Sequence, residues 1–126
     1  MDTIPIPRLR ALVVDDNADI RLVERLQLES GHLFEVVGEA GDGSEAIRLA
    51  GDLQPDVVLL DLAMPVMSGV EAIPAIRRCA PGVRIVVVSA SEPEVWGYVD
   101  GVEAWVTKPF SGESLLDAVA TALSVA

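Results

Sequence analysis

The side chains best suited to chemistry directly follow short apolar segments of the chain. Asp15 and Asp16 close the first apolar run, Asp61 closes the second, and Ser89 closes the third. Lys108, the only lysine, ends a weaker segment in which apolar and polar residues alternate. Because the carboxyl ends of parallel strands meet at one edge of a sheet, where open α/β sheets bind ligands, we expect these five side chains to form one polar cluster.

Three carboxylates so close together repel one another, by about 4 kcal/mol per pair at 4 Å and an effective dielectric constant of 20. The cluster must therefore take up protons, spread apart or bind a cation. Oxygen ligands without histidine or cysteine favour Mg²⁺, which binds few carboxylates and keeps several waters. With Mg²⁺ on one side and the Lys108 ammonium on the other, the pocket suits phosphoryl transfer, which depends on positioning and charge neutralisation.

Each of these residues also has an ordinary structural interpretation when it is taken alone. An Asp-Asp pair after a strand is most often a helix N-cap surrounded by solvent. Ser89 would be a turn residue, and Lys108 a simple counter-ion. The shared position at strand ends favours the functional interpretation.

The elements that must position these residues follow from hydrophobic periodicity. Residues 11–14, 57–60 and 85–88 are short, β-branched runs without alternation, which is typical of buried parallel strands. Residues 34–38 and 103–107 alternate and suit the edges of a sheet.

Helical patterns separate the strands, at residues 17–30, 44–53, 68–79 and 112–124. The first places Ile20, Val23 and Leu26 on one face, and the third contains Pro74, which predicts a kink or a later helix start. About two helical turns fit between Ser91 and Gly101.

The order β-α, repeated five times, predicts an α/β domain with an open parallel sheet and helices on both faces. We expect a loose leader at residues 1–8 and one domain at residues 9–126. The net charge of −11 argues against binding of nucleic acid or an anionic membrane by this domain itself. No apolar run approaches the ~18 residues of a membrane span, and no signal peptide is evident, so a cytoplasmic location is predicted. The single cysteine excludes an internal disulfide.

Four segments of the chain resemble the receiver domain of two-component response regulators. They are LVVDD (12–16), LLDLAMPVMSG (59–69), VVVSA (86–90) and KPF (108–110), which occur in this order over nearly the whole chain. VVGEAGDGSEAI (36–47) looks most like receivers that carry a helix-turn-helix output domain. The resemblance implies a flavodoxin-like (βα)5 fold with strand order 2-1-3-4-5.

By this resemblance, Asp61 accepts a phosphoryl group from a histidine kinase or a phosphotransfer protein. Mg²⁺ would be bound by Asp16, Asp61 and the backbone carbonyl of Ala63, and by Asp15 through water. The protein would be a signalling module that catalyses only its own phosphorylation and slow dephosphorylation, and not an enzyme with a separate substrate.

The same resemblance assigns the residues that respond to the phosphoryl group. Ser89, with Ala90 beside it, would contact the phosphoryl oxygens, Lys108 would pair with them, and the peptide bond before Pro109 would be cis. Trp105 would be the switch aromatic, rotating inward when Ser89 moves. An output domain or downstream protein would bind the face formed by the fourth helix, fifth strand and fifth helix. A phosphorylation-dependent homodimer is compatible with this arrangement.

The chain also departs from the family pattern. The segment between Ser89 and Lys108 is about three residues shorter than usual, so the fourth helix should lose about one turn. Trp105 is bulkier than the usual tyrosine or phenylalanine, which would restrict its rotation. Ala63 and Ser91 occupy positions that tune dephosphorylation, and neither can position a water, which predicts a long-lived phosphoryl group.

Three other functions are weighed against this one. A degenerate receiver that acts by binding alone fits the short fourth-helix segment but not the intact acidic set. A haloacid-dehalogenase-type phosphohydrolase would need Asp-x-Asp after the first strand, and a nucleotide- or flavin-binding protein would need a glycine-rich phosphate loop there. The sequence has neither feature.

Overall fold

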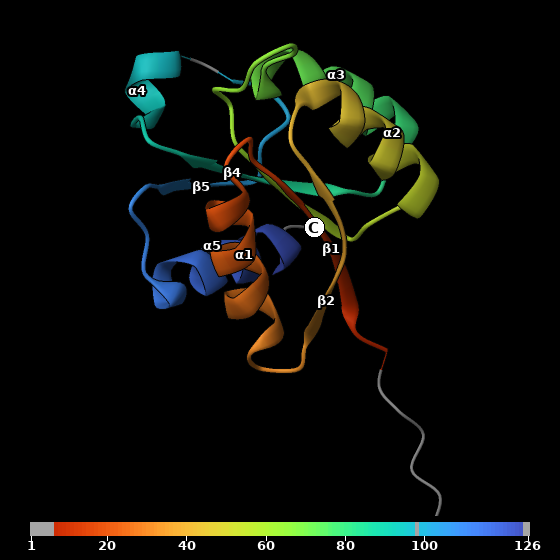
Figure 1. Cartoon of the computed structure of the whole chain (residues 1–126), viewed down its shortest axis with the longest axis vertical. Helices are drawn as coiled ribbons and strands as arrows, with labels where there is room; N and C mark the ends of the chain where they lie inside the picture. Colours follow the sequence, from red (N-terminus) through yellow and green to blue (C-terminus); the bar gives the residue numbers. More distant parts are fainter. Residues whose placement is uncertain (1–6, 98, 125–126) are drawn as a thin grey trace, which may run out of the picture.

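The computed structural model describes residues 7–97 and 99–124, in which five strands and five helices alternate (Figure 1). Most of the predicted leader (residues 1–6) and the last two residues of the predicted domain lie outside this range. The elements are β1 (Leu9–Val14), α1 (Ala18–Glu29), β2 (Phe34–Ala40), α2 (Gly43–Leu53), β3 (Val57–Leu60), α3 (Gly69–Cys79), β4 (Arg84–Ser89), α4 (Pro93–Trp96), β5 (Ala104–Thr107) and α5 (Gly112–Ser124).

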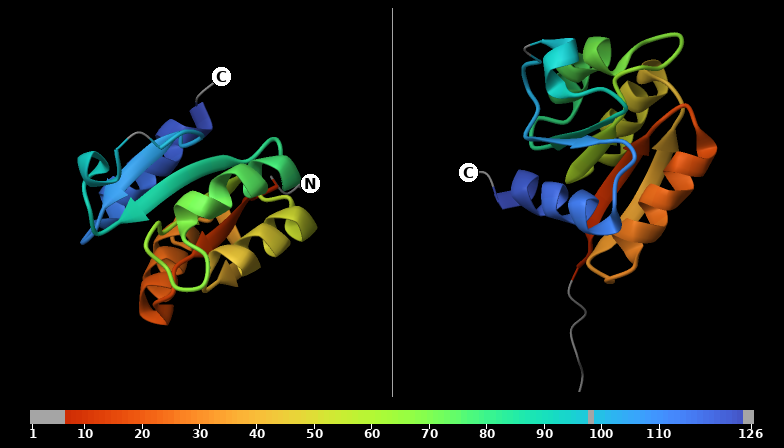
Figure 2. Two further views of the ribbon diagram at one scale, coloured as in Figure 1. Left: turned by 90° about the horizontal axis from the view of Figure 1, so that it is seen from above. Right: turned by 90° about the vertical axis from the view of Figure 1, so that its left-hand side faces the viewer.

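The strands form one parallel sheet in the order β2-β1-β3-β4-β5, which confirms the predicted fold. Helices α1 and α5 cover one face of this sheet, and α2 and α3 cover the other, with α4 beside them (Figures 1 and 2). Among the described residues, no helix is long and apolar enough to cross a membrane.

The central strands are buried on both faces, as their unbroken apolar runs predict. Because successive side chains of a strand point to opposite faces, alternate residues belong to two separate cores. Leu12, Val14 and Leu60 pack with α2 and α3, whereas Val13 and Leu59 pack with α1 and α5. The two cores hold the strand ends in place.

Polar side chains begin the helices where the sequence indicates. The Asp42 carboxylate accepts from the backbone N–H of Glu45 at 2.9 Å, and Ser68 and Glu71 form a reciprocal capping box at the start of α3. Ser111 caps α5 through the backbone N–H of Ser114. Pro74 was expected to cause either a kink or a later helix start. Helix α3 begins at Gly69, so the later start is wrong, and the kink stays a prediction.

The apolar face of α1 on which the sequence places Ile20, Val23 and Leu26 does not face the core. Val23 and Leu26 are exposed, whereas Glu24 and Leu28 are fully buried. The inner stripe follows the spacing of four residues from Ile20 through Glu24 to Leu28, so a carboxyl group takes a position expected to be apolar. Hydrophobic periodicity assigns apolar residues to the buried face of a helix, so it could not place the charged Glu24 there.

Helix α4 is shorter than the two turns expected, because it spans only Pro93–Trp96. Gly97 follows it with a φ of 70°, a positive value that glycine adopts readily, and the chain then returns to the sheet. The short helix agrees with the short segment between Ser89 and Lys108, which predicted the loss of about one helical turn here.

Candidate functional site

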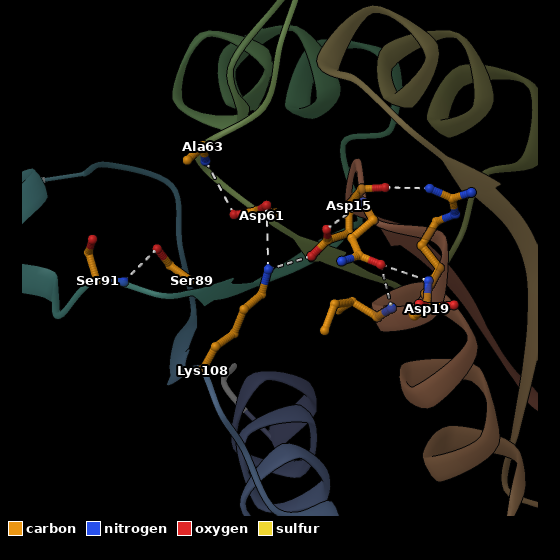
Figure 3. A network of polar contacts seen from close by, with 10 residues as sticks. Asp15, Asp19, Asp61, Ala63, Ser89, Ser91 and Lys108 are labelled. Atoms are coloured by element: carbon orange, nitrogen blue, oxygen red, sulfur yellow. Dashed lines mark hydrogen bonds and ion pairs between the residues drawn. The ribbon is translucent and has the colours of Figure 1, made fainter.

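The polar residues predicted to meet do so at the carboxyl edge of the sheet (Figure 3). Asp15 follows β1, Asp61 follows β3, Ser89 ends β4, and Lys108 follows β5. Asp15 and Ser89 are each 1% exposed, and Asp61 is 5% exposed. The site is therefore a mostly buried cluster drawn from the ends of four adjacent strands.

Backbone hydrogen bonds continue one residue beyond the strands and fix these positions. The N–H of Asp15 donates to the carbonyl of Ala40 at 3.0 Å, and the N–H of Asp61 donates to Val14 at the same distance. The N–H of Lys108 donates to the carbonyl of Ser89 at 2.7 Å. The functional side chains thus project from the rigid end of the sheet and not from free loops.

Asp15, Asp16 and Asp61 form an acidic group whose ligand oxygens all lie within 4.8 Å of one another. Two of these residues are buried, while Asp16 is exposed and faces solvent. Such a set of oxygen donors, open on one side, fits Mg²⁺, which retains water ligands.

The ammonium of Lys108 lies between two of these carboxylates (Figure 3). Its Nζ is 2.6 Å from Asp15 Oδ2 and 3.5 Å from Asp61 Oδ2. Burial alone would lower the pKa of Lys108, but the hydrogen bond to Asp15 and the negative charges of Asp61 and Asp15 outweigh it, so the pKa is raised. The lysine therefore stays charged. The peptide bond from Lys108 to Pro109 is cis.

The surroundings of Asp61 favour the protonated form of its carboxyl group. Burial raises the pKa of this carboxyl and the negative charge of Asp15 adds to the effect, whereas Lys108 and the backbone N–H of Ala63 lower it. The net direction is upward. A cation bound beside Asp61 would restore its ionised form.

The backbone that follows β3 orients the Asp61 carboxylate. The N–H of Ala63 donates to Asp61 Oδ1 at 3.2 Å, and Ala63 itself is exposed. Gly69 approaches this loop so closely that a Cβ atom there would lie 2.3 Å from the Asp61 carbonyl oxygen. The glycine is needed for space, as no larger residue fits behind the acidic group.

Ser89 is connected to Trp105 through one intervening residue. The N–H of Ser91 donates to Ser89 Oγ at 3.2 Å, and the indole N–H of Trp105 donates to the Ser91 carbonyl at 3.3 Å. Trp105 is half-buried against the core that the sheet forms with α2 and α3, and it borders an open surface pocket of about 300 Å³. Ala90, between the two serines, is exposed.

Sequence reasoning did not identify Glu24 as part of this region. This residue of α1 is buried, and its Oε1 has no hydrogen-bond partner in the described part of the chain. Burial raises its pKa from 4.5 to about 8, and Asp15 is the next largest cause. The sequence did contain one signal for its position, because Glu24 lies four residues after Ile20 and four residues before Leu28.

Comparisons with known proteins agree with this geometry. The sequence matches the response regulator receiver domain over residues 11–120. It is 35% identical over 114 residues to the response regulator protein VraR of Staphylococcus aureus, covering 88% of this chain and 54% of that protein. The chain thus spans about half the length of the curated relatives it matches.

Solved structures give the same result. The response regulator domain of Thermotoga maritima CheB superposes with a TM-score of 0.84 at 32% identity, covering 95% of this chain and 99% of that one. A LuxR-family response regulator from Aurantimonas sp. SI85-9A1 superposes with a TM-score of 0.85 at 30% identity, covering 94% and 86%. Together with the acidic cluster at the end of a 2-1-3-4-5 sheet, these matches show that the chain belongs to the response regulator receiver domain family.

Proposed function

We propose that this chain accepts a phosphoryl group on Asp61 from the phosphohistidine of a kinase or phosphotransfer protein. The observation that carries the proposal is the position of Asp61, beside two further carboxylates and 3.5 Å from the Lys108 ammonium. A carboxylate needs such neighbours to accept a phosphoryl group, because its own negative charge repels the incoming phosphoryl oxygens.

In the transfer, one carboxylate oxygen of Asp61 forms a bond to phosphorus while the phosphorus–nitrogen bond of the donor breaks. The electron pair of that bond returns to the imidazole nitrogen, and the product is an acyl phosphate on Asp61. Lys108 already contacts Asp61 and would balance the negative oxygens of the transferred group. The second oxygen of Asp61 is held by the N–H of Ala63, which orients the carboxylate.

Asp16, Asp61 and the carbonyl of Ala63 would hold Mg²⁺, with Asp15 bound to it through water. When bound, this ion neutralises phosphoryl oxygens. Asp15 has a further task without any metal, because its Oδ2 holds the Lys108 ammonium at 2.6 Å. It thereby keeps the cation next to the acceptor.

The regulated output follows from Ser89. Its hydroxyl now accepts from the N–H of Ser91, and a phosphoryl group on Asp61 would compete for that hydroxyl. Movement of Ser89 would alter the loop to α4 and Trp105, and thereby the face formed by α4, β5 and α5. The proposal also includes an output domain or downstream protein that binds this face. It further includes a cytoplasmic location and a long-lived phosphoryl group.

A degenerate receiver that binds partners without phosphorylation is the second candidate, favoured by the one-turn α4. Intact-mass measurement separates the two. The protein is incubated with Mg²⁺ and a small-molecule phosphodonor, alongside Asp61→Asn and the control Asp52→Asn, whose carboxylate is exposed on α2. We expect one phosphoryl group on the wild type and the control, and none on Asp61→Asn or without metal. A wild type that binds Mg²⁺ yet gains no mass would support the degenerate receiver.

A further inference from the structure

One cationic side chain of α1 contacts the backbone of the acidic site. Arg21 lies in the first turn of this helix, and its Nη1 donates to the backbone carbonyl of Asp15 at 2.6 Å, a contact drawn beside Asp15 in Figure 3. Hydrogen bonds from a charged donor are shorter and stronger than those between neutral groups. Arg21 therefore ties the first helix to the backbone of the acidic pair.

The guanidinium of Arg21 is itself held by a second contact. Its Nε pairs with Glu39 Oε1 at 3.0 Å, and Nη2 of Arg25 pairs with the other oxygen of Glu39 at 3.1 Å. Glu39 belongs to β2, the strand next to β1 in the sheet. The Arg21 side chain is only 20% exposed, and its planar fork engages two acceptors at once. Its position is therefore fixed by the sheet.

The carbonyl that Arg21 contacts belongs to the peptide group that leads to Asp16. Because a peptide group is planar, fixing the Asp15 carbonyl oxygen also fixes the N–H of Asp16. The Asp15 side chain is held separately, by Lys108 at 2.6 Å and by the backbone N–H of Asn17 at 2.9 Å. Asp16 is exposed, so the direction of its side chain depends mainly on the backbone that carries it.

We propose that Arg21, held by Glu39, is a positioning residue for Mg²⁺, because it fixes the peptide group through which Asp16 offers its carboxylate to the ion. This inference rests on the Mg²⁺ site of the proposed function. Side chains that orient a metal ligand without touching the metal change metal affinity by about 10- to 100-fold when they are removed.

The charge of Arg21 makes the opposite prediction. A guanidinium near an acidic site repels a divalent cation, so its removal would strengthen Mg²⁺ binding if Arg21 acted through its charge alone. If Arg21 acts by orienting the peptide group, its removal weakens Mg²⁺ binding. The sign of the change in affinity therefore separates the two roles.

Isothermal titration calorimetry with MgCl2 at constant ionic strength measures this affinity without any phosphodonor. We expect Arg21→Ala to bind Mg²⁺ about tenfold more weakly than the wild type. Arg21→Lys should fall between the two, because lysine keeps the charge but lacks the planar fork. Arg48→Ala, which removes an exposed arginine of α2, is the matched control and should keep the wild-type affinity. Circular dichroism checks that each variant folds.

Wild-type or tighter binding of Mg²⁺ by Arg21→Ala would overturn the proposal. If that variant does not fold, the same result for Arg21→Lys would overturn it. A wild type that binds no Mg²⁺ would overturn the metal site of the proposed function and this inference with it, whereas wild-type binding that the Arg21 substitutions leave unchanged would overturn this inference alone.

A double-mutant cycle tests the part assigned to Glu39. If Glu39 acts by holding the guanidinium, Glu39→Gln should weaken Mg²⁺ binding in the wild type but have little further effect in Arg21→Ala. An equal loss of affinity in both backgrounds would mean that Glu39 acts through its own charge, and would overturn its role as the residue that holds Arg21.

Discussion

At the scale of single residues, Glu24 is the least expected feature of the structure. It stands in the inner stripe of α1, where Ile20 and Leu28 are its neighbours, and its pKa is raised from 4.5 to about 8 because it is buried. The folded chain therefore holds a proton that the unfolded chain releases above pH 4.5. The contribution of Glu24 to stability therefore falls as the pH rises between these two pKa values.

Glu24→Gln should remove this dependence because the amide has the same shape and no charge. Below pH 4.5 the variant and the wild type should have similar free energies of unfolding. Toward pH 8 the variant should become more stable, by on the order of 3–4 kcal/mol. Urea unfolding across this pH range measures the difference, with Glu35→Gln, an exposed site on β2, as the control. Parallel pH profiles for wild type and Glu24→Gln would contradict the assignment.

Trp105 is the second residue with a role of its own. Its indole N–H is tied to the Ser91 carbonyl, and Ser91 in turn donates to the Ser89 hydroxyl. Trp105→Phe would keep an aromatic side chain at this position but remove the indole N–H donor.

Intrinsic fluorescence can follow this connection because the chain has only two tryptophans, Trp96 and Trp105. On addition of Mg²⁺ and phosphodonor, the signal of Trp96→Phe should change as that of the wild type does, whereas Trp105→Phe should show little change. Intact mass confirms that both variants are phosphorylated. A full response from Trp105→Phe would place the movement elsewhere.

At the scale of elements, the β3–α3 connection depends on Gly69. Its missing side chain lets α3 start against the backbone of Asp61 and Leu62. Gly69→Ala would drive a Cβ to within 2.3 Å of the Asp61 carbonyl oxygen, so either the helix or the acceptor must move.

We expect Gly69→Ala to destabilise the fold by on the order of 2–4 kcal/mol and to reduce Asp61 phosphorylation. Gly82→Ala is a matched control, because nothing lies within 4 Å of a Cβ at that position. Thermal unfolding and intact mass measure the two effects. If both alanine variants behaved alike, the close packing behind Asp61 would not matter.

The elements also show what periodicity can predict. The three central strands were predictable because both faces of each are buried, so their apolar runs do not alternate. The inner face of α1 was not, because Glu24 stands inside while Leu22 and Leu26 stand outside. The exact length of α4 was not predictable either, since it depends on Gly97 adopting a positive φ. The acidic cluster was predictable because strand ends in a parallel sheet share one edge.

At the scale of the whole molecule, the site concentrates negative charge in a chain that already carries −11. The sequence places Asp15, Asp16 and Asp61 together, but only the fold shows that Lys108 already pairs with two of them. One ammonium does not balance three carboxylates, so a divalent cation should stabilise the folded chain.

Thermal unfolding with and without Mg²⁺ measures this effect. At about 100 times the dissociation constant, Mg²⁺ should add about 3 kcal/mol to the free energy of unfolding. Asp16→Asn should lose most of the gain, and NaCl at matched ionic strength should not reproduce it. Equal stabilisation by both salts would indicate screening of the net charge and no specific site.

The central claim is that Asp61 is the residue that carries the phosphoryl group. The most direct test is to expose the protein to Mg²⁺ and a small-molecule phosphodonor, reduce the acyl phosphate with borohydride and map the converted residue by peptide mass spectrometry. We predict conversion at Asp61 alone, abolished when the metal is chelated. Conversion at Asp15, Asp16 or any other carboxylate, or no conversion at all, would contradict the account.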